Sequence, residues 1–190
     1  MASQPKTLLT PEEYLALERE AEYKSEYFAG EVFAMVGASR KHNLISTNIV
    51  ASLVPQLRDK PCEVYSSDMR VKAARARSYT YPDVVVVCGE PEFEDGQLDT
   101  LLNPTLIVEI LSASTASYDR IKKFGYYRMI ESLAEYLLIA QDEFKIEQYI
   151  KQPDERWLLM DINAPGATVE LNSIQCVLPL GDVYNKVSFT

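Results

Sequence analysis

Apolar residues recur along the chain with spacings that predict both helices and strands. The stretch 10–23 opens with Thr10 and Glu13, which form a capping-box signal for the start of a helix. The stretch 39–58 repeats apolar residues three and four positions apart, which is typical of a helix buried on one side. A third helix is expected at 117–133.

Short apolar runs between these helices predict strands. The runs 82–88 and 105–111 are apolar almost throughout, so both faces of each strand should be covered. The acidic, turn-rich interval 89–104 should be a surface loop. A hairpin is expected at 25–37, turning at Ala29–Gly30. Further strands are predicted at 62–73, 135–141, 145–152, 154–162 and 167–171.

These elements predict one α/β domain over residues 1–190, with a mixed central sheet and flanking helices. The 190 residues suffice for a real core, and no apolar run reaches the roughly 20 residues that a membrane-spanning helix needs. The N-terminus has no apolar signal-peptide core. Three widely spaced cysteines favour buried thiols in a reducing cytoplasm, so a cytoplasmic location is expected. A single histidine argues against a zinc site or a histidine-based triad.

The net charge of −9 opposes binding to phosphate backbones, so any contact with DNA has to be local. One basic segment, "MRVKAARARSY", offers such a contact. It can equally be a solvated strand pair and turn. Its basic residues are Arg70, Lys72, Arg75 and Arg77.

Two carboxylates fall where apolar side chains are expected. Asp83 follows Pro82 at the start of one apolar strand, and Glu109 lies in the middle of the other. An isolated ionised carboxylate in such a place costs several kcal/mol, as an order of magnitude. Three explanations are open: exposure at a strand end, separate ion pairs with Arg or Lys, or a divalent cation shared by both acids. Mg²⁺ is bound through one or two carboxylates and water molecules, so two acids suffice.

The helix expected after Glu109 adds a candidate cation. Asp119, Lys123 and Tyr127 are spaced four positions apart and share one helical face. If that helix folds back over the sheet, Lys123 can orient a water molecule or stabilise charge on a phosphate. Spacing alone favours the simpler interpretation, which is an exposed Asp119–Lys123 pair.

The sequence Pro-Asp, an acid in an apolar strand and then a lysine resembles the PD-(D/E)XK nuclease superfamily, which has the restriction-endonuclease-like fold. The resemblance is closer to a widespread bacterial family described as restriction endonucleases. The matching stretches follow in order over roughly residues 8 to 150. They are "TPEEYLAL", "SEYFAGEVFAM", "SRKHNLI", "SSDMRV", "YPDVVVV", "LIVEILSAST", "YDRIKKFGYY" and "AEYLLIA".

The resemblance implies that Asp83 and Glu109 are metal ligands. The superfamily pattern has its lysine two positions after the glutamate, where this chain has Leu111. In the closer family the lysine lies on the following helix, which matches Lys123. The family also carries further polar positions near the site, and the matching residues here are Glu26 or Glu31, His42 and Asp68.

The resemblance therefore predicts a Mg²⁺-dependent endonuclease that hydrolyses DNA, with Mn²⁺ as a possible substitute metal. Asp83, Glu109 and Lys123 are its expected catalytic residues, and a homodimer is expected for cutting both strands. Two alternatives stay open. One is an inactive binding or assembly module, which the acidic charge and the missing in-strand lysine favour. The other is a nuclease acting on RNA or branched DNA.

Overall fold

The computed structural model describes residues 8–112 and 116–189, and its centre is a mixed six-stranded sheet. The strand order is β11-β10-β9-β8-β6-β3. Of the pairings in this sheet, β8 with β9 is parallel and the others are antiparallel. The bounds are β3 (Cys62–Ser66), β6 (Val84–Cys88), β8 (Leu106–Leu111), β9 (Glu135–Ala140), β10 (Ile146–Lys151) and β11 (Trp157–Ile162).

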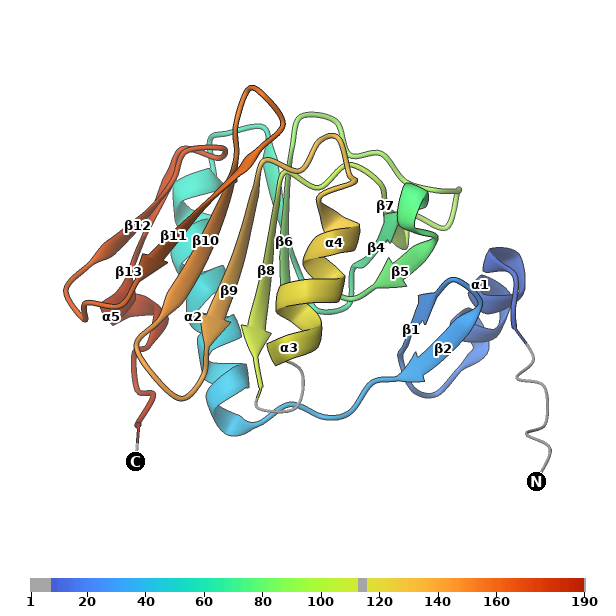
Figure 1. Ribbon diagram of the computed structural model, residues 1–190, viewed down its shortest axis with the longest axis horizontal. Helices are drawn as coiled ribbons and strands as arrows, with labels where there is room; N and C mark the ends of the chain where they lie inside the picture. Colours follow the sequence, from blue (N-terminus) through green and yellow to red (C-terminus); the bar gives the residue numbers. More distant parts are fainter. Residues whose placement is uncertain (1–7, 113–115, 190) are drawn as a thin grey trace.

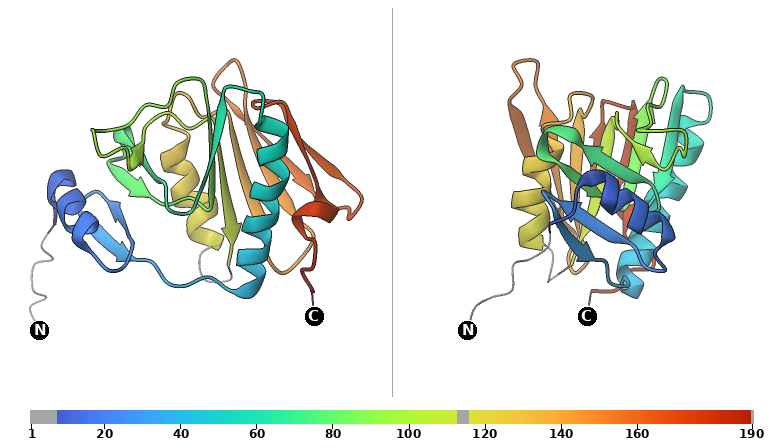
Figure 2. Two further views of the ribbon diagram at one scale, coloured as in Figure 1. Left: turned by 180° about the vertical axis from the view of Figure 1, so that it is seen from behind. Right: turned by 90° about the vertical axis from the view of Figure 1, so that its right-hand side faces the viewer.

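Helices cover both faces of this sheet, as Figures 1 and 2 show. On one face lies α2 (Arg40–Leu57), whose buried residues are Ile45, Ile49, Leu53 and Leu57. The other face is covered by a continuous helical segment, which also supplies the crossover that the parallel strands β8 and β9 require. It consists of α3 (Ala116–Tyr118), a π-helical stretch η2 (Asp119–Lys123) and α4 (Phe124–Tyr127).

A second sheet of five strands carries the N-terminal hairpin. Its order is β2-β1-β5-β4-β7, and β1 joins it through a pairing of Tyr27 with Tyr79 and of Phe28 with Ser78. The elements of this region are α1 (Pro11–Glu20), β1 (Ser25–Phe28), β2 (Glu31–Ala34), β4 (Arg70–Ala73), η1 (Ala74–Ala76), β5 (Ser78–Thr80) and β7 (Thr100–Leu101).

The C-terminal region packs on the α2 side of the central sheet. It consists of β12 (Thr168–Leu171), β13 (Cys176–Pro179) and α5 (Leu180–Val183). Their apolar residues join α2 in one core, while Val85, Ile107 and Tyr136 belong to the core beneath the α3–α4 segment.

Most of the predicted elements are present, and the mixed α/β fold is confirmed. Thr10 caps α1 in a capping box with Glu13, and the hairpin turns at Ala29–Gly30 with φ values of +46° and +101°. The interval 89–104 is not a plain surface loop, because it includes β7, whose Thr100 and Leu101 are buried. The third helix ends at Tyr127, earlier than expected, and part of the turn before it, residues 113–115, lies outside the described residues.

The prediction of three thiols is wrong for two of the cysteines. Cys62 and Cys88 are direct cross-strand partners on β3 and β6 and form a disulfide. Cys176 is free and buried. The cysteines therefore no longer argue for a reducing compartment, and the cytoplasmic location stays a prediction. In the part of the chain that the structure describes, no helix is both long and apolar enough to cross a membrane.

One buried carboxyl group, Glu135, lies at the start of β9. It accepts hydrogen bonds from the hydroxyl of Ser173 at 2.5 Å and from the amide of Gln148 at 3.2 Å. Burial raises the pKa of Glu135, although these hydrogen bonds oppose the shift. A carboxyl whose pKa is higher in the folded than in the unfolded chain contributes stability at low pH and loses it as the pH rises.

We predict that Glu135→Gln flattens the pH dependence of stability. As the pH rises above the ordinary pKa of a glutamate, the wild type should lose free energy of unfolding relative to the variant, because only the wild type must ionise a buried group. Urea denaturation at several pH values measures the difference. Glu155→Gln, at an exposed position, is the control and should follow the wild type. Parallel pH profiles for wild type and Glu135→Gln would contradict the prediction.

Candidate active site

Asp83 and Glu109 come from adjacent antiparallel strands. In the register of β6 and β8, Val84 lies opposite Val108 and Val85 opposite Ile107. Continuing that register by one residue places Asp83 opposite Glu109, and opposite residues of an antiparallel pair point to the same face. Asp83 also accepts a hydrogen bond from the backbone N–H of Ile110 at 2.7 Å, which ties its carboxylate to β8. The two acids therefore lie on one face.

Glu109 is buried in the middle of β8 and has two polar partners on the helical segment. The Nζ of Lys123 lies 3.0 Å from its Oε1, and the hydroxyl of Tyr127 donates to the same oxygen at 2.8 Å. The Tyr127 hydroxyl also lies 2.8 Å from Oγ1 of Thr80, whose own hydroxyl can donate to it. Glu109 is thus held by an ammonium and a phenol, and neither partner is an arginine.

The ammonium of Lys123 lies close to acidic side chains from three parts of the chain. Besides Glu109, its Nζ lies 2.9 Å from an oxygen of Glu26 on β1 and 3.7 Å from an oxygen of Asp119 on η2. All of these side chains are buried. The interpretation of Asp119 and Lys123 as an exposed surface pair is therefore wrong. We call Glu26, Asp83, Glu109, Asp119 and Lys123 the acid cluster.

The electrostatics of the acid cluster are unbalanced, because four carboxyl groups face one ammonium. Burial, together with the neighbouring acids Asp119, Asp83 and Glu26, raises the pKa of Glu109 well above its ordinary value, although Lys123 opposes this shift. Burial alone would lower the pKa of Lys123, but its acidic neighbours outweigh burial and raise that pKa well above the ordinary value. The ammonium is therefore retained, and the site favours additional positive charge or a bound proton.

The donors of the acid cluster suit a hard cation. They are carboxylate oxygens, which Mg²⁺ and Mn²⁺ prefer, and negative charge exceeds positive charge among them. Asp83 and Glu109 could hold such an ion with water completing its coordination. Among the described residues, no group of three or more His, Cys, Asp or Glu side chains is arranged to hold a metal ion. A cation bound here would therefore have fewer than three such side chains as ligands.

Of the further candidates, Glu26 and His42 reach the site. Sequence spacing left Glu26 and Glu31 equivalent; Glu26 is the one that contacts Lys123, while Glu31 follows the hairpin turn. The Nε2 of His42, in the first turn of α2, lies 3.1 Å from Oδ1 of Asp83. Asp68 is elsewhere: it is exposed and pairs with Lys24 at 2.8 Å.

The basic segment is partly engaged in ion pairs. Arg70 is buried, and its guanidinium pairs with Asp99 at 2.9 Å. Lys72 pairs with Glu94, and Arg75 pairs with Glu131. Arg77 is exposed, and its backbone is in the left-handed region, with φ of +52°. The guanidinium of Arg70 therefore faces inward, and a contact of this segment with DNA stays a prediction.

Two residues of the site were not assigned to it from the sequence. Asp119 was considered only as the partner of Lys123, and Tyr127 only as a member of the same helical face. The spacing of four positions was the available signal, but it does not reveal whether that face points to solvent or to Glu109.

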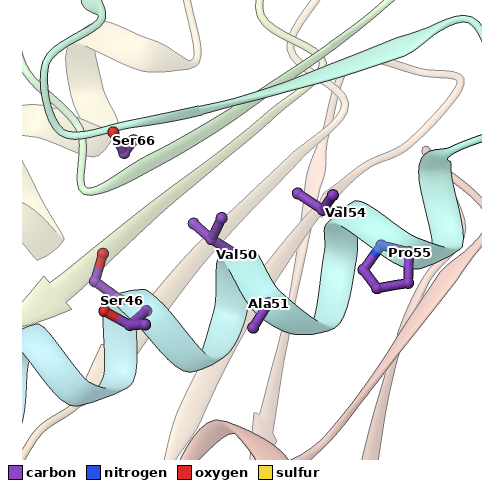
Figure 3. Close-up of a pocket in the computed structure, with 7 residues that line it drawn as sticks. Ser46, Val50, Ala51, Val54, Pro55 and Ser66 are labelled. Atoms are coloured by element: carbon purple, nitrogen blue, oxygen red, sulfur yellow. The ribbon is translucent and has the colours of Figure 1, made fainter.

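A pocket of about 460 Å³ runs along α2, opposite Ser66 (Figure 3). Its lining includes Val50 and Val54 but no residue of the acid cluster.

Comparison with known proteins identifies the family. The family model of Uma2, described as "Putative restriction endonuclease", matches residues 11–180. The chain belongs to the Uma2 family. The match includes every residue of the acid cluster. Membership in Uma2 confirms the resemblance that the sequence motifs indicate.

The alignments with similar proteins cover most of this chain. "Uncharacterized protein sll1609" of Synechocystis sp. is 42% identical over 165 residues, which are 87% of this chain and 93% of that protein. "Uncharacterized protein slr1290" of the same organism is 35% identical over 187 residues, 98% of this chain and 97% of that one. A crystal structure from Anabaena variabilis, described as "a putative nuclease belonging to DUF820", has a TM-score of 0.79 at 20% identity, covering 95% of this chain and 99% of that one. This last likeness supports the fold.

We predict that Lys123→Met strongly destabilises the protein. The substitution removes the ammonium from Glu26, Glu109 and Asp119 while keeping a side chain of similar length. Breaking a buried ion pair from one side costs about 3–5 kcal/mol. Urea denaturation measures this loss.

The neighbouring Lys122 provides the matched control, because it is exposed on the same helical segment. Lys122→Met should change the free energy of unfolding by no more than about 0.5 kcal/mol. Equal losses for the two variants would mean that Lys123 does not neutralise the acid cluster.

Proposed function

We propose that this chain is a metal-dependent endonuclease that hydrolyses phosphodiester bonds of DNA at the acid cluster. The observation that carries this proposal is the pairing of Asp83 with Glu109 across adjacent strands, beside the buried ammonium of Lys123. Membership in Uma2 supports it, because that family is described in terms of restriction endonucleases.

Asp83 and Glu109 are the proposed ligands of Mg²⁺ or Mn²⁺. Such a cation, when bound, supplies polarisation of a phosphate oxygen and a lower pKa for a coordinated water molecule. The chain contributes the orientation of the two acids. The backbone N–H of Ile110 and the imidazole of His42 hold the Asp83 carboxylate, while Tyr127 holds that of Glu109. Fixed acids lose little freedom when they take up a ligand.

Lys123 is the proposed electrostatic catalyst. Its ammonium keeps its proton among Glu26, Glu109 and Asp119, so it is a permanent positive charge beside the metal ligands. A fixed positive charge in a buried site stabilises negative charge that develops on a phosphate. The ammonium can also hold a water molecule near the phosphate by donating a hydrogen bond.

A binding or assembly module is the second candidate function. It is favoured by the ion pairs of Lys123, which satisfy two of the acids without a metal. In that case the acid cluster is structural, and divalent cations neither stabilise the protein nor support cleavage. Metal dependence therefore separates the two candidates.

We predict that the wild type nicks supercoiled plasmid in the presence of Mg²⁺ or Mn²⁺ and is inactive in EDTA. Asp83→Asn and Glu109→Gln should each reduce the nicking rate about 100-fold or more, because each removes a charged group from the site. Asp68→Asn is the control: this acid is exposed and pairs with Lys24, so the variant should nick like the wild type.

Metal binding gives an independent measurement on the same proteins. Mg²⁺ should raise the melting temperature of the wild type and of Asp68→Asn, because a ligand that binds the folded state stabilises it. It should not raise that of Asp83→Asn. Equal nicking by all variants would indicate a contaminating nuclease and remove the enzymatic proposal.

We also propose a homodimer. Each chain has one active site, so two copies of the chain can each cut one strand of a duplex. Light scattering during size-exclusion chromatography should then give about twice the mass of one chain, which is 21.5 kDa. A single-chain mass at micromolar concentration would contradict the dimer and leave single-strand nicking as the expected product.

A further inference from the structure

The edge strand β11 exposes a run of apolar side chains. It ends the central sheet on one side and, in the part of the chain that the structure describes, pairs only with β10. Leu158, Leu159 and Met160 are 50%, 47% and 45% exposed. Within residues 8–112 and 116–189, no other three consecutive large apolar residues are exposed. This edge of the sheet is therefore apolar as well as unpaired.

β11 lacks the features that usually protect the edge of a sheet. Natural edge strands are blunted by lysine, proline, a bulge or a very short length. β11 has six residues, contains neither Lys nor Pro, and follows β10 in an unbroken register from Trp157 to Ile162. The opposite edge strand, β3, exposes no large apolar side chain. An uncovered edge like that of β11 is a template for pairing with another strand.

The residues of β11 are complementary to a second copy of the same strand. When identical strands pair antiparallel about a two-fold axis, the central residue lies opposite its own copy and its neighbours pair reciprocally. With Leu159 at the centre, Leu158 lies opposite the partner's Met160. Opposite residues point to the same face of a sheet, so each exposed apolar side chain then contacts an apolar side chain of the second copy.

The same register also places a hydrogen-bond donor opposite an acceptor. Trp157 lies opposite the partner's Asp161, because the two positions are equally far from Leu159. The Trp157 ring packs edge-on against Phe124 with ring centres 5.4 Å apart, and its indole N–H has no hydrogen-bond partner among the described residues. The carboxylate of Asp161 is 57% exposed and can accept from it. This pair occurs twice in a two-fold dimer.

The neighbouring registers are less favourable. Centring on Leu158 places Glu155 opposite the partner's Asp161, and like charges directly opposite each other destabilise a sheet. Centring on Met160 places Leu159 opposite the partner's Asp161, so an apolar side chain faces a carboxylate. Leu159 is therefore the expected centre. Because this pairing uses the β11 edge of both chains, assembly closes at two copies.

We infer that β11 is the surface through which two copies of this chain associate, in an antiparallel pairing centred on Leu159 that joins their central sheets. The inference rests on the proposed homodimer for the number of chains and is independent of the proposed hydrolysis. β9 and β10 lie between β11 and the strand of Glu109, so the pairing leaves both acid clusters uncovered. Figure 1 shows β11 on the side of the sheet away from the hairpin that supplies Glu26.

Cysteine cross-linking tests the pairing and its register in the full chain. Leu159→Cys should form a disulfide-linked dimer on mild oxidation, because this residue faces its own copy. Leu158→Cys and Met160→Cys should cross-link to a several-fold greater extent when mixed than when each is oxidised alone, because they are opposite only each other. Non-reducing electrophoresis measures the linked fraction. The native cysteines are either paired or buried, so they do not compete.

A charge at the centre of the pairing should separate the two copies. Leu159→Lys is tolerated in a single chain because the position is half exposed, but it sets two ammonium groups against each other in the dimer. We expect self-association to weaken about 100-fold or more, as measured by light scattering over a concentration series. Val54→Lys is the matched control: Val54 is also 47% exposed, but it lies on α2, and the variant should remain dimeric.

Each other outcome has a distinct meaning. A dimer that survives Leu159→Lys, or that does not cross-link through Leu159→Cys, uses another surface and overturns the inference. A wild type that stays a single chain at high micromolar concentration overturns it together with the homodimer. If Leu159→Lys does not fold, the cross-linking result decides. A cross-linked β11 dimer in a protein that never nicks plasmid would retain this surface and reject the proposed hydrolysis.

Discussion

The buried ammonium of Lys123 is the interaction on which the architecture of the site depends. It joins Glu26 of the second sheet, Glu109 of the central sheet and Asp119 of its own helical segment. Carboxylates at these depths repel one another and lack water, so without a central positive charge they would have to be neutralised or moved apart. The same charge that stabilises the fold therefore also keeps the acids close enough to act together.

Two features of the backbone make this arrangement possible. The antiparallel register of β6 and β8 sets Asp83 opposite Glu109. The hydrogen bond from the backbone N–H of Ile110 fixes the carboxylate of Asp83, which is the residue just before β6. The helical segment then returns over the sheet with a π-helical stretch from Asp119 to Lys123. Stretches of this kind are frequent at functional sites. Here it lies where the lysine meets its acids.

The sequence predicted the parts that depend on local patterns and on the resemblance. The capping box of Thr10, the hairpin turn and the apolar strands around Asp83 and Glu109 are encoded by neighbouring residues, so short-range rules suffice for them. The choice between Glu26 and Glu31 was not accessible, because it depends on where the hairpin docks. The inward direction of Arg70 and the disulfide of Cys62 with Cys88 likewise depend on strand pairing over long distances. Local spacing carries no information about such pairing.

The early position of Glu26 in the chain has a consequence for biosynthesis. Its partner Lys123 follows only after the hairpin, α2 and six further strands have been made. When the strands of the second sheet have left the ribosome, Glu26 is therefore present before the lysine that neutralises it has been synthesised. Because domains made N-terminus first cannot form contacts to residues not yet synthesised, the centre closes late. Fragments interrupted before the helical segment would carry Glu26, Asp83 and Glu109 but neither Asp119 nor Lys123, so their acid cluster would be incomplete.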